Sequence, residues 1–399
     1  MIEPMTYFGT FWIPNNEGKR MFGTYTYKED GSSIIEIHRC DYEGTFFSLP
    51  PKYGVLWGEI ADGYPMTFFD VTPMGKRGES YYLFYSKYVL TKYHVQSLDD
   101  ELFDRCFVKF NHLNAWVRKN TFEINYGTSE ITYISNYDET VISSDIILDV
   151  NLSASICSLV LDSIIPFYSC KLTQETYFRL YAQSCKSIGY FIELITEITQ
   201  FVSVALLSKQ YPDKILFGDD IRLLVNNKES EKPTHILIPF ELLKDRVPIL
   251  LNNWHKYYSD ISPLCTRYLN SLNQSDFDTP DFLLIATSLD GFYRRFISND
   301  DGISYKSRLD KLIEKFKDID AVKEYSIDTE VFKDSRNKYA HLFPESEAPK
   351  AVFGKELYIL TQKGVILLTC CFLNLLGLNN EEINICCKNA RLQNRLNIL

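Results

Sequence analysis

The sequence predicts an α+β protein, in which an antiparallel, β-rich, sandwich-like N-terminal domain precedes an all-α helical bundle. Up to about residue 170, short runs of β-branched and aromatic residues are interrupted by turn signals roughly every 8–12 residues. From Thr173 the apolar residues recur near helical spacing, and from Phe240 helix starts and stops follow one another to the end. We therefore expect a β-rich domain over residues 1–172, a helical and strand connector over 173–239, and a bundle over 240–399.

The strands of the N-terminal domain are delimited by turn residues such as Asn15-Asn16-Glu17-Gly18 and Asp62-Gly63. The chain contains 27 Tyr and 27 Phe, and most of this aromatic excess is N-terminal. We assign these side chains to the core and the sheet surface, with a binding face as the alternative. The expected strands are Tyr7–Ile13, Met21–Tyr27, Ser33–His38, Val55–Ile60 and Ser80–Tyr88.

The connector is expected to hold a helix over Thr173–Ser208, followed by a strand-like pair over Lys214–Val225 and Thr234–Pro239 with a polar stretch between them. In the bundle, Thr279 is a good N-cap because Pro280 follows it at the first helical position. Sequential helices with short loops indicate an up-and-down bundle. The expected helices are Phe240–Leu272 (one or two), Thr279–Ile297, Ser304–Phe316, Thr329–His341, Lys355–Leu378 and a short one near Glu381–Asn389.

Composition narrows the class of protein. The chain has 399 residues, 45% apolar and 24% charged, with a formal charge of −10, which does not suit a general nucleic-acid binder but leaves room for a small basic cleft. The ten cysteines form no CxxC pair, and no metal-ligand spacing emerges. Without a signal peptide, we expect a cytoplasmic protein with free thiols, and the apolar run Val365–Leu378 is too short to span a membrane. We expect no metal and no cofactor.

The stretch from Asp328 to Pro344 carries the strongest candidate chemistry. Asp328 resembles a helix start and Pro344 a stop, which places His341 in the last turn, where the helix dipole favours a protonated imidazole. Arg336 precedes His341 by five positions. An arginine can hold a phosphate while a histidine moves a proton, which is the minimum equipment for metal-free RNA cleavage. The spacing alone is expected roughly once by chance, and Arg105 with His112 is a second match in a strand-and-turn segment.

An acidic and a basic residue lie on the helix expected after Thr279. Ile285, Leu289, Phe292 and Phe296 form its buried stripe, and Asp290 with Arg294 lies on a neighbouring face. One interpretation is a surface salt bridge between residues four apart. The other is that Asp290 orients Arg294, or the arginine of the later motif, toward a cleft.

The segments Leu289–Arg294 and Arg336–His341, about forty residues apart in a helical C-terminal region, resemble a HEPN domain. Ribonucleases of that superfamily pair an acid-x3-basic helix with an Arg-x4–6-His helix. Here Asp290 stands where glutamate is usual, and Asn337 fits the polar residue common after the arginine. Because Arg336 lies about 140° round the helix from His341, a site using both needs a groove, which the resemblance supplies through dimers whose motif helices face each other.

The N-terminal half is similar to that of ApeA-like HEPN proteins. The similarity lies in Phe8–Pro14, in Met21–Thr24, in the segment from Leu102 to Trp116, and in Trp254 at the start of the helical part. The resemblance implies an RNA-cleaving effector of bacterial anti-phage abortive-infection defence. It further implies a β domain that senses or restrains, a phage-derived trigger, and a homodimer or higher oligomer. Transfer RNA is a plausible substrate on this resemblance alone.

The resemblance also implies roles for individual residues. His341 would act as general base or acid and Arg336 would stabilise the phosphoryl charge, giving a 2′,3′-cyclic phosphate and a 5′-hydroxyl. Asn337 would contact the phosphate or position His341, while Asp290 and Arg294 would set the arginine. Lys338 and Tyr339 are candidate RNA-binding residues, with a solvated lysine and an inward-packed tyrosine as alternatives.

Two further functions remain open at this point. The bundle could be a non-catalytic HEPN interaction module that works through protein contacts. It could also be a latent ribonuclease that its own β domain or a partner holds inactive. Loss of toxicity in a His341→Ala variant would favour a nuclease, and activity released by deleting residues 1–239 would favour a latent one.

Overall fold

The computed structural model describes residues 5–38, 52–60, 63–77, 81–117, 124–127, 130–133, 146–149, 152–164, 171–218, 220–225, 229–272 and 279–392. The chain divides into two compact units. The β unit comprises Met1–Asn114, Lys119–Thr196 and Tyr211–Ser230, and the helical unit comprises Ala115–Arg118, Glu197–Gln210 and Glu231–Leu399. Each unit is described by itself. The predicted boundaries at residues 172 and 239 stay a prediction.

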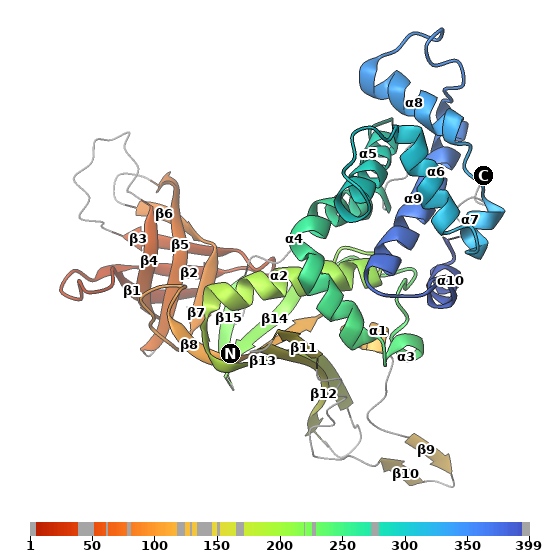
Figure 1. Ribbon diagram of the computed structural model, residues 1–399. Helices are drawn as coiled ribbons and strands as arrows, with labels where there is room; N and C mark the ends of the chain where they lie inside the picture. Colours follow the sequence, from red (N-terminus) through yellow and green to blue (C-terminus); the bar gives the residue numbers. More distant parts are fainter. Residues whose placement is uncertain are drawn as a thin grey trace. The chain divides into compact units, whose positions relative to one another are not determined.

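The β unit is built from antiparallel strands, most of which join one large sheet (Figure 1). The strands are β1 Met5–Trp12, β2 Met21–Tyr27, β3 Ser33–His38, β4 Tyr53–Ile60, β5 Tyr64–Arg77, β6 Tyr81–Ser86, β7 Tyr88–Thr91, β8 Glu101–Phe110, β9 Ile124–Gly127, β10 Glu130–Tyr133, β11 Ile146–Asp149, β12 Leu152–Ile164, β13 Lys171–Ser187, β14 Pro212–Phe217 and β15 Ile221–Val225. Strands β9 and β10 form a separate hairpin.

Strands β1 to β6 close into a barrel. The sheet order β5-β4-β1-β2-β3-β6 returns to its beginning because β6 also pairs with β5. Strand β5 makes this possible by changing partners: Met66–Phe69 pair with β7, whereas Thr72–Arg77 pair with β6. Asp70, with φ of 54°, lies at the change. The predicted α+β class is confirmed, and the part expected to be sandwich-like takes the form of a barrel extended by a sheet.

The barrel interior is filled by aromatic and branched side chains, including the fully buried Phe11, Tyr25, Phe68 and Phe84. Gly9 and Gly23 face each other across β1 and β2. A Cβ on Gly9 would lie 2.6 Å from the carbonyl oxygen of Glu59, and one on Gly23 would meet the carbonyl oxygen of Glu36. The glycines of the Phe8–Pro14 and Met21–Thr24 segments therefore allow the strands to approach closely.

Two predictions in the connector were wrong. Thr173–Ser187 is not helical but belongs to β13, which is paired on both edges, with β12 and with β8. From Phe178 to Ala182 its burial alternates, with Phe178, Leu180 and Ala182 buried and Tyr181 exposed, so the period there is that of a strand. The predicted pair of strands instead lies within residues 212–225, as β14 and β15, and no strand forms over Thr234–Pro239. Pairing with neighbouring strands outweighed the helix-like spacing.

The helical unit is organised around α9 and α5, and α5 packs against α4, α6, α8 and α9. The helices predicted for this unit are confirmed, and both predicted ends of α8 are correct. Gly364 of α9 marks the closest approach, because an added Cβ would lie 2.7 Å from Ile285 and 3.3 Å from the Phe332 ring. The helices of the described chain are α1 Leu113–Val117, α2 Ile188–Ala205, α3 Phe240–Leu243, α4 Val247–Leu272, α5 Thr279–Phe296, α6 Tyr305–Lys315, α7 Asp320–Glu324, α8 Thr329–His341, α9 Gly354–Leu375 and α10 Asn380–Asn389.

Two tryptophans attach the early segments to the helical unit. The indole of Trp116 donates to the carbonyl oxygen of Ile238 at 2.7 Å, and that of Trp254 donates to the carbonyl oxygen of Glu197 at 3.0 Å. Phe201 of α2 packs edge-on against Trp254, with ring centroids 5.6 Å apart. Residues 115–118 and 197–210 are therefore structural parts of the helical unit, although they precede residue 240.

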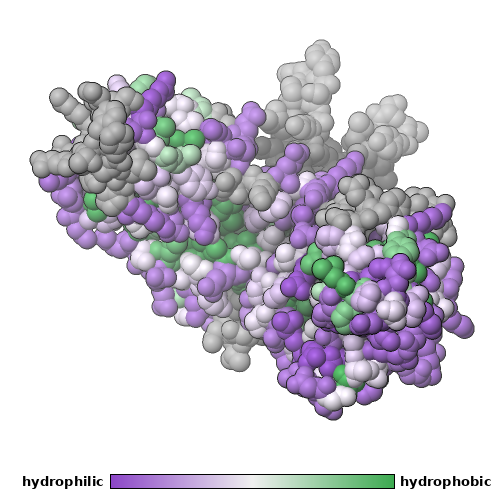
Figure 2. All heavy atoms as spheres, turned by 90° about the horizontal axis from the view of Figure 1, so that it is seen from above, coloured by the Kyte–Doolittle hydropathy of each residue, from purple (hydrophilic) through white to green (hydrophobic). Residues whose placement is uncertain are grey.

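Among the described residues, α2 and α9 are long and apolar enough to cross a membrane by length and composition alone. In α2, 56% of the apolar window is buried inside the protein, and in α9 78% is buried. This burial is what core helices show, although α9 with 22 residues is longer than the apolar run Val365–Leu378 that was expected to be too short to span. The face seen in Figure 2 is mostly hydrophilic, with hydrophobic residues in separate groups.

Candidate active site on helix α8

Helix α8 begins and ends where its sequence signals indicate. The Asp328 carboxylate accepts hydrogen bonds from the backbone N–H groups of Glu330 at 2.9 Å and Val331 at 3.2 Å, which caps the first turn. At the other end, Leu342 takes a left-handed conformation with φ of 55° and stops the helix. Leu342 is 85% exposed, so burial of its side chain does not offset the strain of the left-handed backbone conformation.

The segment after α8 is tied back onto the helix, which fixes the end that carries His341. The buried carboxylate of Asp334 accepts from the Lys350 N–H at 3.1 Å, and the buried Ser335 hydroxyl accepts from the Val352 N–H at 3.1 Å. The Tyr339 hydroxyl donates to the Val352 carbonyl oxygen at 2.9 Å. These bonds make the surroundings of His341 a defined surface.

Arg336 and His341 meet within one chain. Nη1 of Arg336 lies 3.1 Å from Nε2 of His341 and 3.0 Å from Oδ1 of Asn337. The long arginine side chain thus spans the angle that separates the two positions on the helix. A guanidinium only donates hydrogen bonds, so in this contact Nε2 of His341 is the acceptor.

Asp290 of α5 is held between two arginines. Its Oδ2 accepts from Nε of Arg294 at 3.2 Å, and its Oδ1 accepts from Nη1 of Arg308 at 2.7 Å. The Arg294 guanidinium also donates to Asp301 at 2.7 Å, and this bond with the charge of Asp290 raises the pKa of Arg294. The Arg308 side chain is only 5% exposed and that of Asp290 22%. The pairing of Asp290 with Arg294 is therefore extended by a more buried pairing with Arg308.

The α5 pair and the α8 pair are linked through Tyr305, the first residue of α6. The guanidinium carbon of Arg336 lies 5.2 Å from the centroid of the Tyr305 ring. Burial raises the pKa of Tyr305 well above its ordinary range; the charge of Arg336 opposes this shift and that of Asp290 adds to it. In the described chain, the ion pairs of Asp290 are with Arg294 and Arg308 and not with Arg336.

The two candidate RNA-binding residues differ in their surroundings. Tyr339 packs edge-on against Phe282, with ring centroids 6.4 Å apart, and its hydroxyl is bonded to Val352. These contacts support the inward-packing alternative. Lys338 lies over the Phe353 ring, 4.6 Å from its centroid, and 3.7 Å from a Glu345 oxygen. Contact of either residue with RNA stays a prediction.

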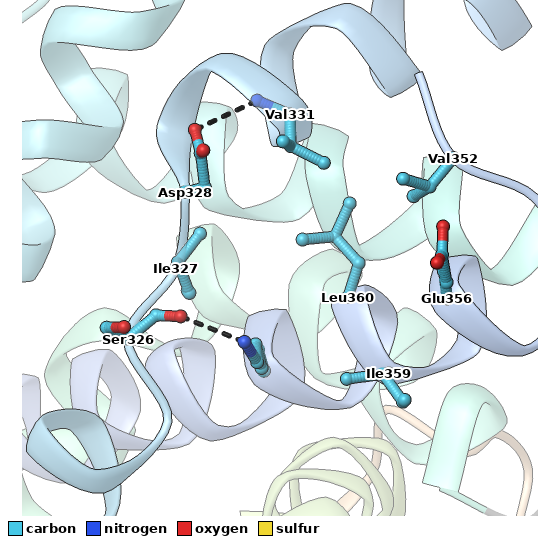
Figure 3. Close-up of a pocket in the computed structure, with 9 residues that line it drawn as sticks. Ser326, Ile327, Asp328, Val331, Val352, Glu356, Ile359 and Leu360 are labelled. Atoms are coloured by element: carbon cyan, nitrogen blue, oxygen red, sulfur yellow. Dashed lines mark hydrogen bonds between the residues drawn. The ribbon is translucent and has the colours of Figure 1, made fainter. Parts of the chain in front are cut away.

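A hollow of about 700 Å³ lies at the opposite end of α8 (Figure 3). The lining combines apolar side chains such as Val331 and Leu360 with the carboxylates of Asp328 and Glu356 and the ammonium of Lys363. The end of α8 that bears His341 is about 20 Å away along the helix. Two carboxylates against one ammonium do not suit a phosphodiester, and neither Arg336 nor His341 lines the hollow, so we place the candidate active site at those two residues instead.

Sequence reasoning missed Arg308 and Tyr305. A signal for Arg308 was present, because it lies on the same face of its predicted helix as Leu309, Leu312 and Phe316. A charged residue on a buried stripe needs a partner of opposite charge. No comparable sequence pattern marks Tyr305, because its importance depends on the position of the Arg336 guanidinium in the folded chain.

Comparison with family models gives two matches. The model of the ApeA N-terminal domain 1 matches residues 6–254, and that of the Apea-like HEPN domain matches residues 283–382. The first match alone covers more than half of the chain. The chain belongs to the ApeA family. Its fold, an antiparallel β-barrel and sheet followed by a helical HEPN region, and its membership fit a HEPN effector of anti-phage defence.

HEPN domains are usually ribonucleases, and the Apea-like HEPN match includes Asp290, Arg294, Arg308, Arg336 and His341. No curated protein and no solved structure matches the chain significantly. Among the described residues, no three His, Cys, Asp or Glu side chains group as metal ligands.

Proposed function

We propose that this ApeA-family protein is a metal-independent endoribonuclease and the effector of an anti-phage abortive-infection system. The observation that carries the proposal is the 3.1 Å contact between Nη1 of Arg336 and Nε2 of His341 at the exposed end of α8. The guanidinium can donate hydrogen bonds to a phosphate, the imidazole can accept a proton, and the contact holds these two groups together. Family membership supports the same chemistry.

In the proposed reaction, Nε2 of His341 takes the proton of the ribose 2′-hydroxyl as its oxygen attacks the adjacent phosphorus. The new 2′-O–P bond forms as the P–O5′ bond breaks, and the 5′-oxygen takes a proton from solvent or from the His341 of a second copy. Arg336 would exchange its bond to Nε2 for the phosphoryl oxygens, where negative charge grows. The products are a 2′,3′-cyclic phosphate and a 5′-hydroxyl.

The direct test is cleavage of total RNA and of purified transfer RNA in excess EDTA. We expect wild-type protein to produce 2′,3′-cyclic phosphate ends, and Arg336→Ala and His341→Ala each to lose about a hundredfold or more in rate, because each removes a group of the transition state. Cleavage that EDTA abolishes, or that His341→Ala leaves intact, contradicts the mechanism. No cleavage by purified wild type, together with no His341-dependent toxicity in phage-infected cells, would favour the non-catalytic interaction module.

The chain supplies its own matched control. Arg105 and His112 repeat the arginine-to-histidine pattern, but Arg105 lies in β8 and His112 in the turn after it. From Arg105 to the end of β8 the extended chain already spans about 17 Å. Arg105→Ala and His112→Ala should therefore keep full RNA cleavage. This control shows whether a loss of cleavage is specific to Arg336 and His341 or follows from removing any arginine and histidine with this spacing.

The proposal includes a homodimer in which two α8 helices share one cleft. Mixing Arg336→Ala with His341→Ala protein tests this. If the cleft combines Arg336 of one copy with His341 of the other, mixed dimers regain one intact pair and cleave RNA. If each copy uses its own pair, mixing restores nothing. Light scattering of the same samples reports whether dimers form.

The proposal assigns sensing or restraint to the β unit and activation to a phage-derived trigger. A latent enzyme would be inactive when purified, although its site is intact. Deleting residues 1–239 is a poor test, because Trp116, Glu197 and Phe201 are packed within the helical unit. Toxicity in phage-infected cells that carry the full chain, compared with His341→Ala, tests latency without disturbing that packing.

A further inference from the structure

Helix α6 places a rigid aromatic ring between α5 and α8. Ser304 caps α6, since its hydroxyl accepts from the Ser307 N–H at 3.2 Å. Tyr305 follows at once, and its hydroxyl donates to the Ala286 carbonyl oxygen of α5 at 3.2 Å. The ring is therefore held at its backbone by the capped helix end and at its hydroxyl by α5.

The guanidinium of Arg336 rests over this ring. Its central carbon is 5.2 Å from the ring centroid, within the range of a cation–π contact. To reach His341, the Arg336 side chain must bend about 140° round its own helix. A free arginine side chain samples many rotamers, most of which point away from His341. A ring on one side of the guanidinium removes many of these alternatives.

We propose that Tyr305 is a positioning residue for Arg336: its ring holds the guanidinium where Nη1 reaches both His341 and a bound phosphate. The inference rests on the proposed function, because the benefit of placing Arg336 is realised on a phosphate. Tyr305 acts through Arg336 and takes no part in bond making. Tyr305 lies outside both the acid-x3-basic segment and the arginine-to-histidine segment.

Two further observations support this role. Burial raises the pKa of Tyr305, so the hydroxyl keeps its proton and continues to donate to Ala286. Arg308, three residues later on α6, donates to Asp290 at 2.7 Å. One turn of α6 thus contacts the acidic residue on α5 and the arginine on α8, and sets the two parts of the site relative to each other.

The experiment compares Tyr305→Phe, Tyr305→Leu and Tyr305→Met in the full chain. Phenylalanine keeps the ring and loses the hydroxyl, whereas leucine and methionine remove the ring. Methionine is unbranched and flexible and can fill an irregular gap, so it serves if the leucine variant folds poorly. Tyr268→Leu is the control. Tyr268 is fully buried on α4, and its hydroxyl contacts that of Thr369 at 2.8 Å. The Arg336 guanidinium lies over the Tyr305 ring and not over this one.

The first measurement is independent of RNA. The protein is prepared with isotope-labelled arginine, and the NMR signals of the Arg336 side chain are identified by their absence in Arg336→Ala. These signals should show an upfield ring-current shift. We expect the shift to remain in Tyr305→Phe and Tyr268→Leu and to vanish in Tyr305→Leu and Tyr305→Met. An unchanged shift in the variants without a ring overturns the inference.

The second measurement is kcat and KM for RNA, per folded molecule. A cation–π contact of this kind corresponds to roughly a three- to thirty-fold loss of kcat, with KM changed by less than about twofold because transition-state stabilisation is lost. Tyr305→Phe should retain wild-type kcat. Wild-type kcat in Tyr305→Leu, or an equal loss in Tyr268→Leu, overturns the inference. If purified wild type does not cleave RNA and the full chain shows no His341-dependent toxicity in phage-infected cells, the proposed function fails, and the NMR shift alone decides whether Tyr305 places Arg336.

Discussion

The buried ion pair between Asp290 and Arg308 should be the most stability-critical polar contact near the site. Asp290→Ala leaves the Arg308 guanidinium, whose side chain is 5% exposed, with a 3.4 Å contact to the Asp300 carbonyl oxygen as its one remaining hydrogen bond among the described residues. Its Nε is already buried, and no described residue accepts a hydrogen bond from it. Breaking a buried pair by removing one partner costs about 3–5 kcal/mol. Because Asp290 is 22% exposed, we expect about 2–4 kcal/mol.

The matched control is Arg294→Ala, which removes the other partner of Asp290. The Arg294 side chain is 36% exposed and its second partner Asp301 is 89% exposed, so this change should cost less than about 1 kcal/mol. The double variant Asp290→Leu/Arg308→Met removes both buried charges together. It should recover most of the stability lost in Asp290→Ala, because no unpaired charge stays in the interior.

The assay is urea unfolding followed by far-ultraviolet circular dichroism, which reports on the helices. The free energy of unfolding should fall in the order wild type, Arg294→Ala, Asp290→Ala, with the double variant nearer to wild type. The reasoning is refuted if Asp290→Ala costs no more than Arg294→Ala. It is also refuted if the double variant is less stable than Asp290→Ala, since unpaired charge would then not be the cause.

Three further predictions concern the end of α8, the cysteines and one surface pair. Leu342→Gly should raise the free energy of unfolding by up to about 1 kcal/mol in urea titrations, because glycine relieves the left-handed strain and little burial is lost; a destabilised variant would contradict this. Iodoacetamide should label the exposed Cys185 in native protein, whereas the doublets should react only after unfolding, because burial raises the pKa of Cys371 and Cys386; peptide mass spectrometry decides. The hydrogen bond from Lys333 holds the pKa of Glu330 below its ordinary value of 4.5, so Glu330→Gln should be less stable than wild type above that pH. The difference should disappear as the pH falls through the lowered pKa, and a difference that persists in acid would exclude this linkage.

Local signals predicted α8 well because its ends depend on neighbours in sequence. Asp328 caps the first turn with its own side chain, and the stop lies just before Pro344. The predicted helix Thr173–Ser208 failed at its first half for the opposite reason. Residues 173–187 pair with β8 and β12, and no local pattern reports on partners so far away along the chain.

The same distinction applies to the candidate site. The sequence by itself determined its chemical groups: an acid and a base four apart on one helix, and an arginine and a histidine five apart on another. It also determined the family, because the Gly9 and Gly23 segments and the Arg336–His341 segment are both local patterns. Only the tertiary structure decided how these groups meet. The ring of Tyr305 beneath Arg336 and the ion pair of Arg308 with Asp290 join residues of different helices, and the bend of Arg336 brings it to His341 on another side of the same helix. Such contacts depend on the packing of α5, α6 and α8 against one another, which spacing along a single helix does not encode.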